Sequence, residues 1–191
     1  MIDALAGSLG LDAGNPAFWM PLLMMALLFI LIVGAALFDG FDIGVGVLVL
    51  LAPKQSRSQL MVVLSPLRDA NGFWMLLALG LFLTAFPMAW GAVLGALYVP
   101  MSLTMIGVML RSVAFEFRVR AASDKRGRWI ALFWLGSLLT AVGHGALISQ
   151  LVLGAKQDAP ALWFTGFIAL CAVAGYGLLG ACWLVMRLQD E

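Results

Sequence analysis

Two carboxylates, Asp39 and Asp42, interrupt an apolar stretch in the segment LFDGFDIGVG at residues 37–46. Residues three apart on a helix face roughly the same side, one turn apart. An ionised carboxylate inside a membrane costs about 2.5–3.5 kcal/mol on insertion scales, so a pair requires a partner, water or protonation. Because two like charges this close favour one keeping a proton, the pair suits a proton-holding site. The alternative is a wetted or arginine-paired position near the cytoplasmic end of a tilted helix.

A second polar island, SPLRDANGFW, occupies residues 65–74 and carries Asp69 and Asn71. Asp69 is a candidate for the opening of a polar path that leads inward from the cytoplasm. The alternative is an interfacial ion pair between Asp69 and the neighbouring Arg68, which would contribute little to stability.

A third polar island, LRSVAFEFRVR at residues 110–120, contains Arg111, Glu116 and Arg118 around an apolar core. Arg111 either extends its charged end to the membrane surface or reaches inward to a buried carboxylate. The candidate residues for a proton path or buried polar network are therefore Asp39, Asp42, Asp69, Asn71, Arg111 and Glu116.

The chain's one histidine, His144, lies in the segment AVGHGA inside an apolar run. A single histidine cannot supply the two axial ligands of a bis-histidine haem, and no cysteine or acid stands at metal-ligand spacing from it. A hydrogen bond between packed helices is the favoured role for His144, and a haem or metal ligand is the alternative.

The elements that must position these residues are membrane helices. The chain has 191 residues, of which 63% are hydrophobic and 11% charged, whereas soluble domains carry about a quarter charged residues. The net charge of +1 gives no field for binding nucleic acid. Five apolar runs are long enough to cross a bilayer as helices: about 18–50, 62–86, 89–113, 128–153 and 161–186. We therefore expect an all-α integral membrane protein with one transmembrane domain over residues 1–191.

The distribution of cations predicts the orientation. Of the eleven Lys and Arg residues, all but Lys156 fall in or beside the connections on one side of the membrane. Under the positive-inside rule this places the N-terminus outside and the C-terminus in the cytoplasm. Because the first 19 residues contain no Lys or Arg, we expect the first apolar run to stay in the mature protein rather than act as a signal peptide. The basic connection is also suited to anionic membrane lipid.

The predicted orientation of the helices also indicates which polar residues lie close together. Asp39 and Asp42 lie toward the inner end of the first run, Asp69 begins the second from that side, and Arg111 ends the third there. All four groups share one membrane level, so the two carboxylates are expected to face the bundle or a partner subunit, close to Arg111 or to water connected with Asp69.

Several motifs, in this order, resemble subunit II of the cytochrome bd-type quinol oxidases. FDGFDIGVG is similar to the first helix of that family, and RDANGFW is similar to its WDGNE-x-W motif. TAFPMAWGAVLGALYVP and LRSVAFEFR resemble its third-span region, and AGYGLLGACWLVMR resembles its fifth span. The combination of DGFD with R-x-V-A-F-E-F-R is specific, and the matches cover nearly the whole chain.

The resemblance implies a multi-pass protein of a bacterial-type cell membrane that works in a complex. In this family, subunit I carries the b- and d-type haems and the quinol site, and subunit II binds no haem. The complex oxidises quinol and reduces O₂ to water with protons taken from the cytoplasm. Subunit II stabilises the haem subunit, is implicated in a proton path, and can hold a structural quinone.

The chain departs from the family in two respects. Arg68, Ala70 and Gly72 stand where members usually have Trp, Gly and an acid or Gln. The family also has about eight spans, so the resemblance implies a half-length form here: a natural half subunit, a split gene's product or a truncation. A further small subunit would then supply the missing helices.

Two other classes compete with the oxidase subunit. One is a small proton-coupled transporter that uses Asp39 and Asp42 directly, although such proteins usually show repeats or paired broken helices. The other is a structural membrane protein that takes part in no chemistry.

Overall fold

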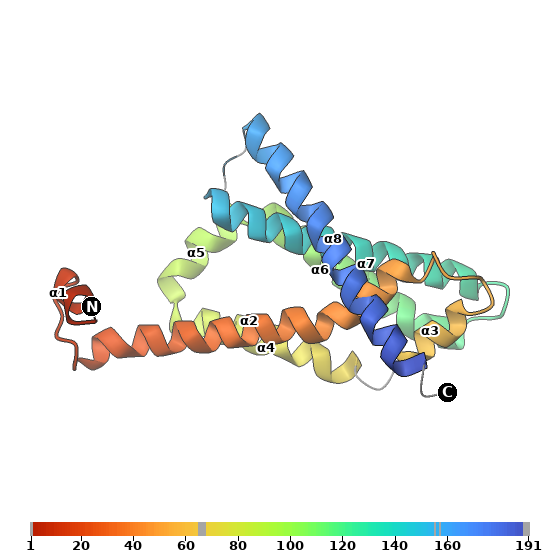
Figure 1. Cartoon of the computed structure of the whole chain (residues 1–191), viewed down its shortest axis with the longest axis horizontal. Helices are drawn as coiled ribbons and strands as arrows, with labels where there is room; N and C mark the ends of the chain where they lie inside the picture. The colour runs from red at the N-terminus through yellow and green to blue at the C-terminus, as the bar shows by residue number, and fades with distance from the viewer. Residues whose placement is uncertain (1, 65–67, 155, 157, 189–191) are drawn as a thin grey trace.

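The computed structural model describes residues 2–64, 68–154, 156 and 158–188, and the side chains of residues 5, 68–72 and 188 lie outside this description. The described part of the chain is helical and contains no strand (Figure 1). Its helices are α1 Ile2–Ser8, α2 Pro16–Leu48, α3 Arg57–Val63, α4 Arg68–Ala85, α5 Pro87–Ala96, α6 Tyr98–Arg120, α7 Arg126–Leu153 and α8 Ala159–Leu188. The expected all-α membrane class is confirmed.

The long helix α2 owes its start and its end to specific polar groups. Pro16 stands at its beginning, where no backbone N–H is needed, and the side chain of Asn15 accepts a hydrogen bond from the Ala17 N–H at 2.9 Å. After its last turn, the guanidinium of Arg57 donates to the carbonyls of Leu50 and Ala52 at 2.7 and 3.0 Å. At 33 residues, or about 50 Å, α2 exceeds the hydrocarbon thickness, as expected for the first apolar run.

Four described helices, α2, α6, α7 and α8, are long and apolar enough to cross a membrane. The pair α4 and α5 counts as a fifth crossing if it is one broken span, because its two halves bend by 120° at Phe86. The bend has a local cause. A residue before proline is driven away from helical geometry, and Phe86, at φ −130° and ψ 57°, precedes Pro87.

The third predicted span, 89–113, differs from the structure. Its first part belongs to α5, and the chain restarts after Leu97 as α6, which continues to Arg120. Hydropathy alone does not register such breaks. The end of α6 stays helical although it is charged, because Arg118 and Arg120 in its last turn complement the helix dipole. Arg111 therefore lies within α6 rather than at its end.

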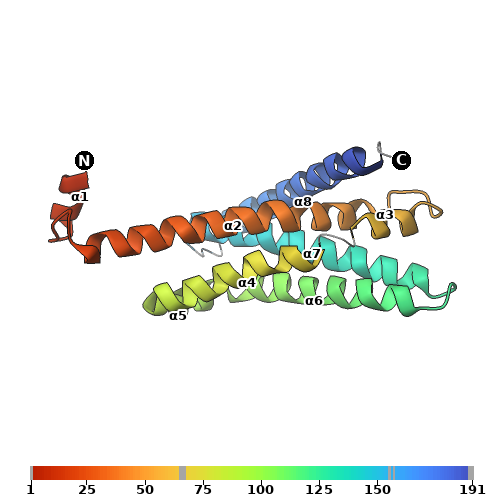
Figure 2. The ribbon, with the colours of Figure 1, turned by 90° about the horizontal axis from the view of Figure 1, so that it is seen from below.

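Glycine contacts bring the helices of the bundle close together. A Cβ on Gly107 of α6 would lie 2.8 Å from the Gly136 carbonyl of α7, so these two helices meet backbone to backbone. A Cβ on Gly44 of α2 would lie 2.8 Å from the Gly180 Cα of α8. Close approach at small residues is the usual way in which membrane helices associate. Figure 2 shows α6 alongside α7 and α2 alongside α8.

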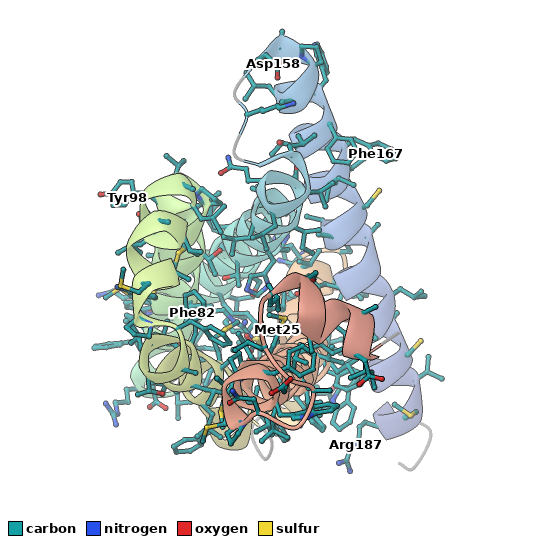
Figure 3. The ribbon with its side chains drawn as sticks, turned by 90° about the vertical axis from the view of Figure 1, so that its left-hand side faces the viewer. Met25, Phe82, Tyr98, Asp158, Phe167 and Arg187 are labelled. Carbon is teal, nitrogen blue, oxygen red and sulfur yellow. The ribbon has the colours of Figure 1, made fainter. Side chains whose placement is uncertain are left out.

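The buried core lies at one end of the bundle. It joins the last turns of α2 to α3, α6 and α7 through Val45, Val49, Leu60, Met61, Leu64, Ala114, Phe115, Ile130 and Phe133. Elsewhere, large apolar side chains point outward. Tyr98 and Phe167 project from opposite sides of the bundle in Figure 3 and are 66% and 63% exposed. An apolar exterior of this kind suits contact with lipid or with partner helices.

Candidate buried polar site

Arg111 of α6 bridges both carboxylates of the DGFD segment. Its Nη1 lies 3.3 Å from Asp39 Oδ1, and its Nη2 bonds to Asp42 Oδ2. Arg111 and Asp42 are 2% and 4% exposed, while the Asp39 side chain is 20% exposed. The expected proximity of these three residues is therefore present in the structure. One guanidinium facing two carboxylates leaves the group with an excess of negative charge if all three are ionised.

Helix geometry explains how the three side chains meet. Asp39 and Asp42 lie one turn apart on α2, so both project toward the same neighbour. Helix α7 packs against both α2 and α6, and the Arg111 side chain reaches across this junction with its guanidinium 5.9 Å from the Phe133 ring centroid. The Arg111 backbone is held close to α7, since a Cβ on Gly136 would lie 2.6 Å from the Arg111 nitrogen.

A second polar group, the buried His144 and the half-buried Tyr176, lies next to the first. His144 Nδ1 of α7 and the Tyr176 hydroxyl of α8 are 2.8 Å apart. The Tyr176 ring packs on α2, where a Cβ on Gly40, the residue after Asp39, would lie 3.0 Å from its Cε1. Both His144 and Tyr176 interact electrostatically with Asp39 and Arg111. The predicted helix-packing hydrogen bond of His144 is thus confirmed.

Tyr176 is the residue that the sequence analysis missed. It is one of two tyrosines, and it stands inside the AGYG segment of an apolar run. Its position in mid-helix, away from the interfacial belt where tyrosine usually lies, is the signal that could have indicated a hydrogen-bonded hydroxyl. Five residues, Arg111, Asp39, Asp42, His144 and Tyr176, are called the polar cluster below.

Glu116 does not join the polar cluster, which corrects its inclusion in the buried network. Its side chain is 67% exposed, and its nearest cation is Arg120 at 4.0 Å. The reason is helical periodicity: five residues separate Glu116 from Arg111, which turns it about 140° away around α6. An exposed pair of this kind contributes little to stability.

Asp69 and Asn71 fall where the side chains lie outside the described residues. Their backbone belongs to the first turns of α4, a helix that packs against α2. Whether they reach the polar cluster stays a prediction.

A haem ligated by His144 would need space beside α7, yet the glycines that flank it pack directly on neighbouring helices. A Cβ on Gly143 would lie 2.9 Å from the Thr104 nitrogen of α6, and one on Gly145 would lie 3.0 Å from the Ala169 nitrogen of α8. Helix α7 is thus packed closely against α6 and α8 on both sides of His144. The chemistry within reach of the cluster is the holding of a proton or the clamping of helices.

The chain is similar to known oxidase subunits. A family model described as cytochrome bd terminal oxidase subunit II matches residues 20–191. The cytochrome bd-I ubiquinol oxidase subunit 2 of Escherichia coli strain K12 is 28% identical over 179 residues, which are 85% of this chain and 47% of that protein. The cytochrome bd ubiquinol oxidase subunit 2 of Bacillus subtilis strain 168 is 33% identical over 140 residues, or 72% of this chain and 41% of that protein. The chain thus spans about half the length of the curated relatives it matches.

Proposed function

Because the chain belongs to the family of cytochrome bd terminal oxidase subunit II, we propose that it is the haem-free subunit of a membrane quinol oxidase. The family and the apolar helices make it a multi-pass protein of the inner membrane. In the proposed complex, two quinols are oxidised to quinones and one O₂ takes up the four electrons and four protons to give two waters. The haem-bearing subunit I carries this chemistry, and this chain supports it.

The observation that carries the proposal is the bridge from Arg111 to Asp39 and Asp42. It ties α2 to α6 at the centre of the bundle, where a buried charge without partners would be costly. We assign it first a clamping role that keeps this face of the subunit in the shape that the partner requires. The excess carboxylate also gives the cluster the capacity to hold a proton, and Asp39, the more exposed acid, is where a proton would enter.

The absence of haem in this chain is part of the proposal. It is supported by the close helix packing on both sides of His144, and it assigns the b- and d-type haems to the partner. A structural quinone belongs to the same proposal. Lipid extraction of the purified complex, followed by mass spectrometry, tests this. One quinone per complex is expected, and a complex without quinone would contradict it.

The partners follow from the same proposal. Beside subunit I, we assign the second half of the family's helices to a further chain or segment, because the match covers less than half of the relatives' length. The exposed apolar faces of α2 and α8 offer surfaces for such helices or for membrane lipid.

One observation favours the rival transporter. The bent pair of α4 and α5 has the form of a broken helix, which transporters use to build substrate sites. Such transporters carry broken helices in matching pairs, and the described residues contain one bent pair. The family match therefore outweighs this feature.

Purification in mild detergent tests the proposed function. The expected result is a coloured complex that contains a haem protein and consumes O₂ when quinol is added. A colourless chain that purifies alone, with quinol oxidase activity intact in the membranes from which it was removed, would overturn the proposal.

A further inference from the structure

A cationic cavity of about 620 Å³ lies at the end of the bundle where α2 and α6 finish and α3 and α7 begin. Figure 2 shows these elements gathered at one end, away from α5 and α1. Its described lining residues include four cations, Lys54, Arg57, Arg118 and Arg126, and no acid. Four like charges around one cavity repel each other unless an anion enters, so the charge pattern itself points to a ligand.

Arg118 is the most informative member of this cavity. It is only 7% exposed, its Nη1 donates to the Ser58 carbonyl at 3.3 Å, and its guanidinium lies 5.4 Å from the Phe115 ring centroid. Its buried Nε has no hydrogen-bond partner among the described residues. A guanidinium carries five N–H donors in a fixed fork, and leaving one unpaired in a buried position is costly. Arg118 lines the cavity, so a ligand with acceptor oxygens would accept from the guanidinium donors that face it.

Two of the other cations, Arg57 and Arg126, are held in place by hydrogen bonds to backbone carbonyls. Arg57 donates to the carbonyls of Leu50 and Ala52 after α2, and Arg126 Nε donates to the Ala121 carbonyl at 3.2 Å. These bonds fix where the two guanidinium groups stand before any ligand arrives. A planar, preorganised guanidinium suits phosphate oxygens in particular.

The wall of the cavity also has an apolar part. Val62 of α3 and Val119 of α6 line it and are 62% and 65% exposed. Exposed valines beside cations, at the end of membrane helices, fit a molecule with an anionic head and hydrocarbon tails. Basic groups at this depth are known to attract anionic lipid headgroups.

We propose that this cationic cavity binds a phosphate group, carried either by an anionic phospholipid or by a soluble phosphate compound. In this site the guanidinium of Arg118 contacts the phosphate oxygens, and the positive charges of Lys54 and Arg126 balance the negative charge of the phosphate. The site does not depend on the oxidase function, because none of its residues belongs to the polar cluster.

Binding to the full chain, purified with any subunit that accompanies it, tests the site. The probes are phosphatidylglycerol, phosphatidylcholine with the same tails, and inorganic phosphate, measured by native mass spectrometry for the lipids and by isothermal titration for phosphate. The main variant is Lys54→Gln with Arg126→Gln, which removes two rim charges and leaves the buried Arg118 in place. Arg118→Gln is a second variant. The matched control is Arg120→Gln with Arg128→Gln, which removes two cations that do not line the cavity.

The expected result is preferential binding of phosphatidylglycerol that weakens roughly thirty-fold in the rim variant and remains unchanged in the control. Binding of inorganic phosphate with the same dependence, without preference between the two lipids, would support the site and identify its ligand as soluble. Equal binding of both lipids together with no phosphate binding would overturn the proposal. An equal loss of binding in the rim variant and in the control would also overturn it, because such a loss would reflect the net charge of the protein rather than a specific site.

Discussion

The guanidinium of Arg111 on α6 binds the carboxylate of Asp42 on α2 in the buried centre of the bundle, and both side chains are about 95% buried or more. Their positions in the chain are 69 residues apart, so the contact is one of tertiary structure rather than of neighbouring turns. Because Asp39 shares the same guanidinium, the three side chains form a unit whose members are unequal in burial. The difference in burial predicts how the three side chains rank in the stability that is lost when each is replaced.

Replacing Arg111 should be the most damaging change in this unit. Arg111→Met leaves two acids facing each other without a cation, and removal of one partner from a buried ion pair costs about 3–5 kcal/mol. Asp42→Asn should cost less, since Arg111 keeps Asp39, and Asp39→Asn should cost least, because that side chain is 20% exposed and its bond is 3.3 Å long. Thermal unfolding of the detergent-solubilised protein measures this order. Equal losses for all three variants would contradict it.

The same carboxylates separate the clamping role from proton transfer. Asp39→Asn and Asp42→Asn keep the size and hydrogen-bonding capacity of the side chains but abolish titration. We expect the haem content of the purified complex to fall, most for Asp42→Asn, while O₂ consumption per haem stays within about twofold of the wild type, a small change in barrier. A tenfold loss of turnover at full haem content would instead assign proton transfer to these acids. Glu116→Gln, on the exposed face of α6, serves as the control.

The pair of His144 and Tyr176 should contribute a measurable hydrogen bond. Tyr176→Phe removes the hydroxyl 2.8 Å from His144 Nδ1 and leaves that buried nitrogen unsatisfied, which should cost about 1–3 kcal/mol. His144→Phe removes the other partner, and the double variant should cost less than the sum, with a coupling of about 0.6–1.7 kcal/mol, as found between membrane helices.

Tyr98 supplies the matched control for this cycle. It is the chain's other tyrosine and is 66% exposed, so Tyr98→Phe should leave stability unchanged. Additive losses in the double variant would show that the two side chains are not coupled.

Glycine substitutions should distinguish the helix contacts from open helix faces. In Gly136→Ala the new Cβ would lie 2.6 Å from the Arg111 nitrogen and 2.8 Å from the Gly107 carbonyl, so α6 must move away from α7. Overpacking of this kind costs about 1–3 kcal/mol and should also weaken the contact between Arg111 and Asp42. Gly80→Ala, where a Cβ meets nothing within 4 Å, should be neutral or slightly stabilising. Thermal unfolding of both variants is the measurement, and comparable losses would refute the contact.

The contact between Arg111 and the two acids could be predicted from the sequence, because it follows from charge and helix spacing alone. Two acids one turn apart in an apolar run need a cation, and the cation distribution placed Arg111 at the same membrane level. The hydrogen bond of His144 followed from the cost of a buried imidazole in a helix interface. Its partner could not be named, because choosing Tyr176 requires the relative rotation of α7 and α8, which packing decides.

The errors have equally local causes. Apolar length suggested one span over 89–113, but the run contains a break after Leu97, and Pro87 separates α4 from α5 just before it. The proline was visible in the sequence, yet hydropathy averages over it. Glu116 was grouped with Arg111 by nearness along the chain, whereas five residues on a helix place two side chains on different faces.

The orientation in the membrane is the last prediction, and it is motivated by the cations, of which all but Lys156 lie on one side of the five predicted runs. Position 127, in the first turn of α7 beside Arg126 and Arg128, should face the cytoplasm, and position 159, where α8 begins, should face outward. Gly127→Cys and Ala159→Cys are suitable probes because both sites are exposed and a Cβ at Gly127 meets nothing within 4 Å. The free and exposed Cys171 and Cys182 must first be replaced by alanine. A membrane-impermeant maleimide added to intact cells should label position 159 at once and position 127 only after permeabilisation. Labelling of position 127 in intact cells would reverse the orientation, and with it the assignment of Asp39 and Asp42 to the cytoplasmic half of α2.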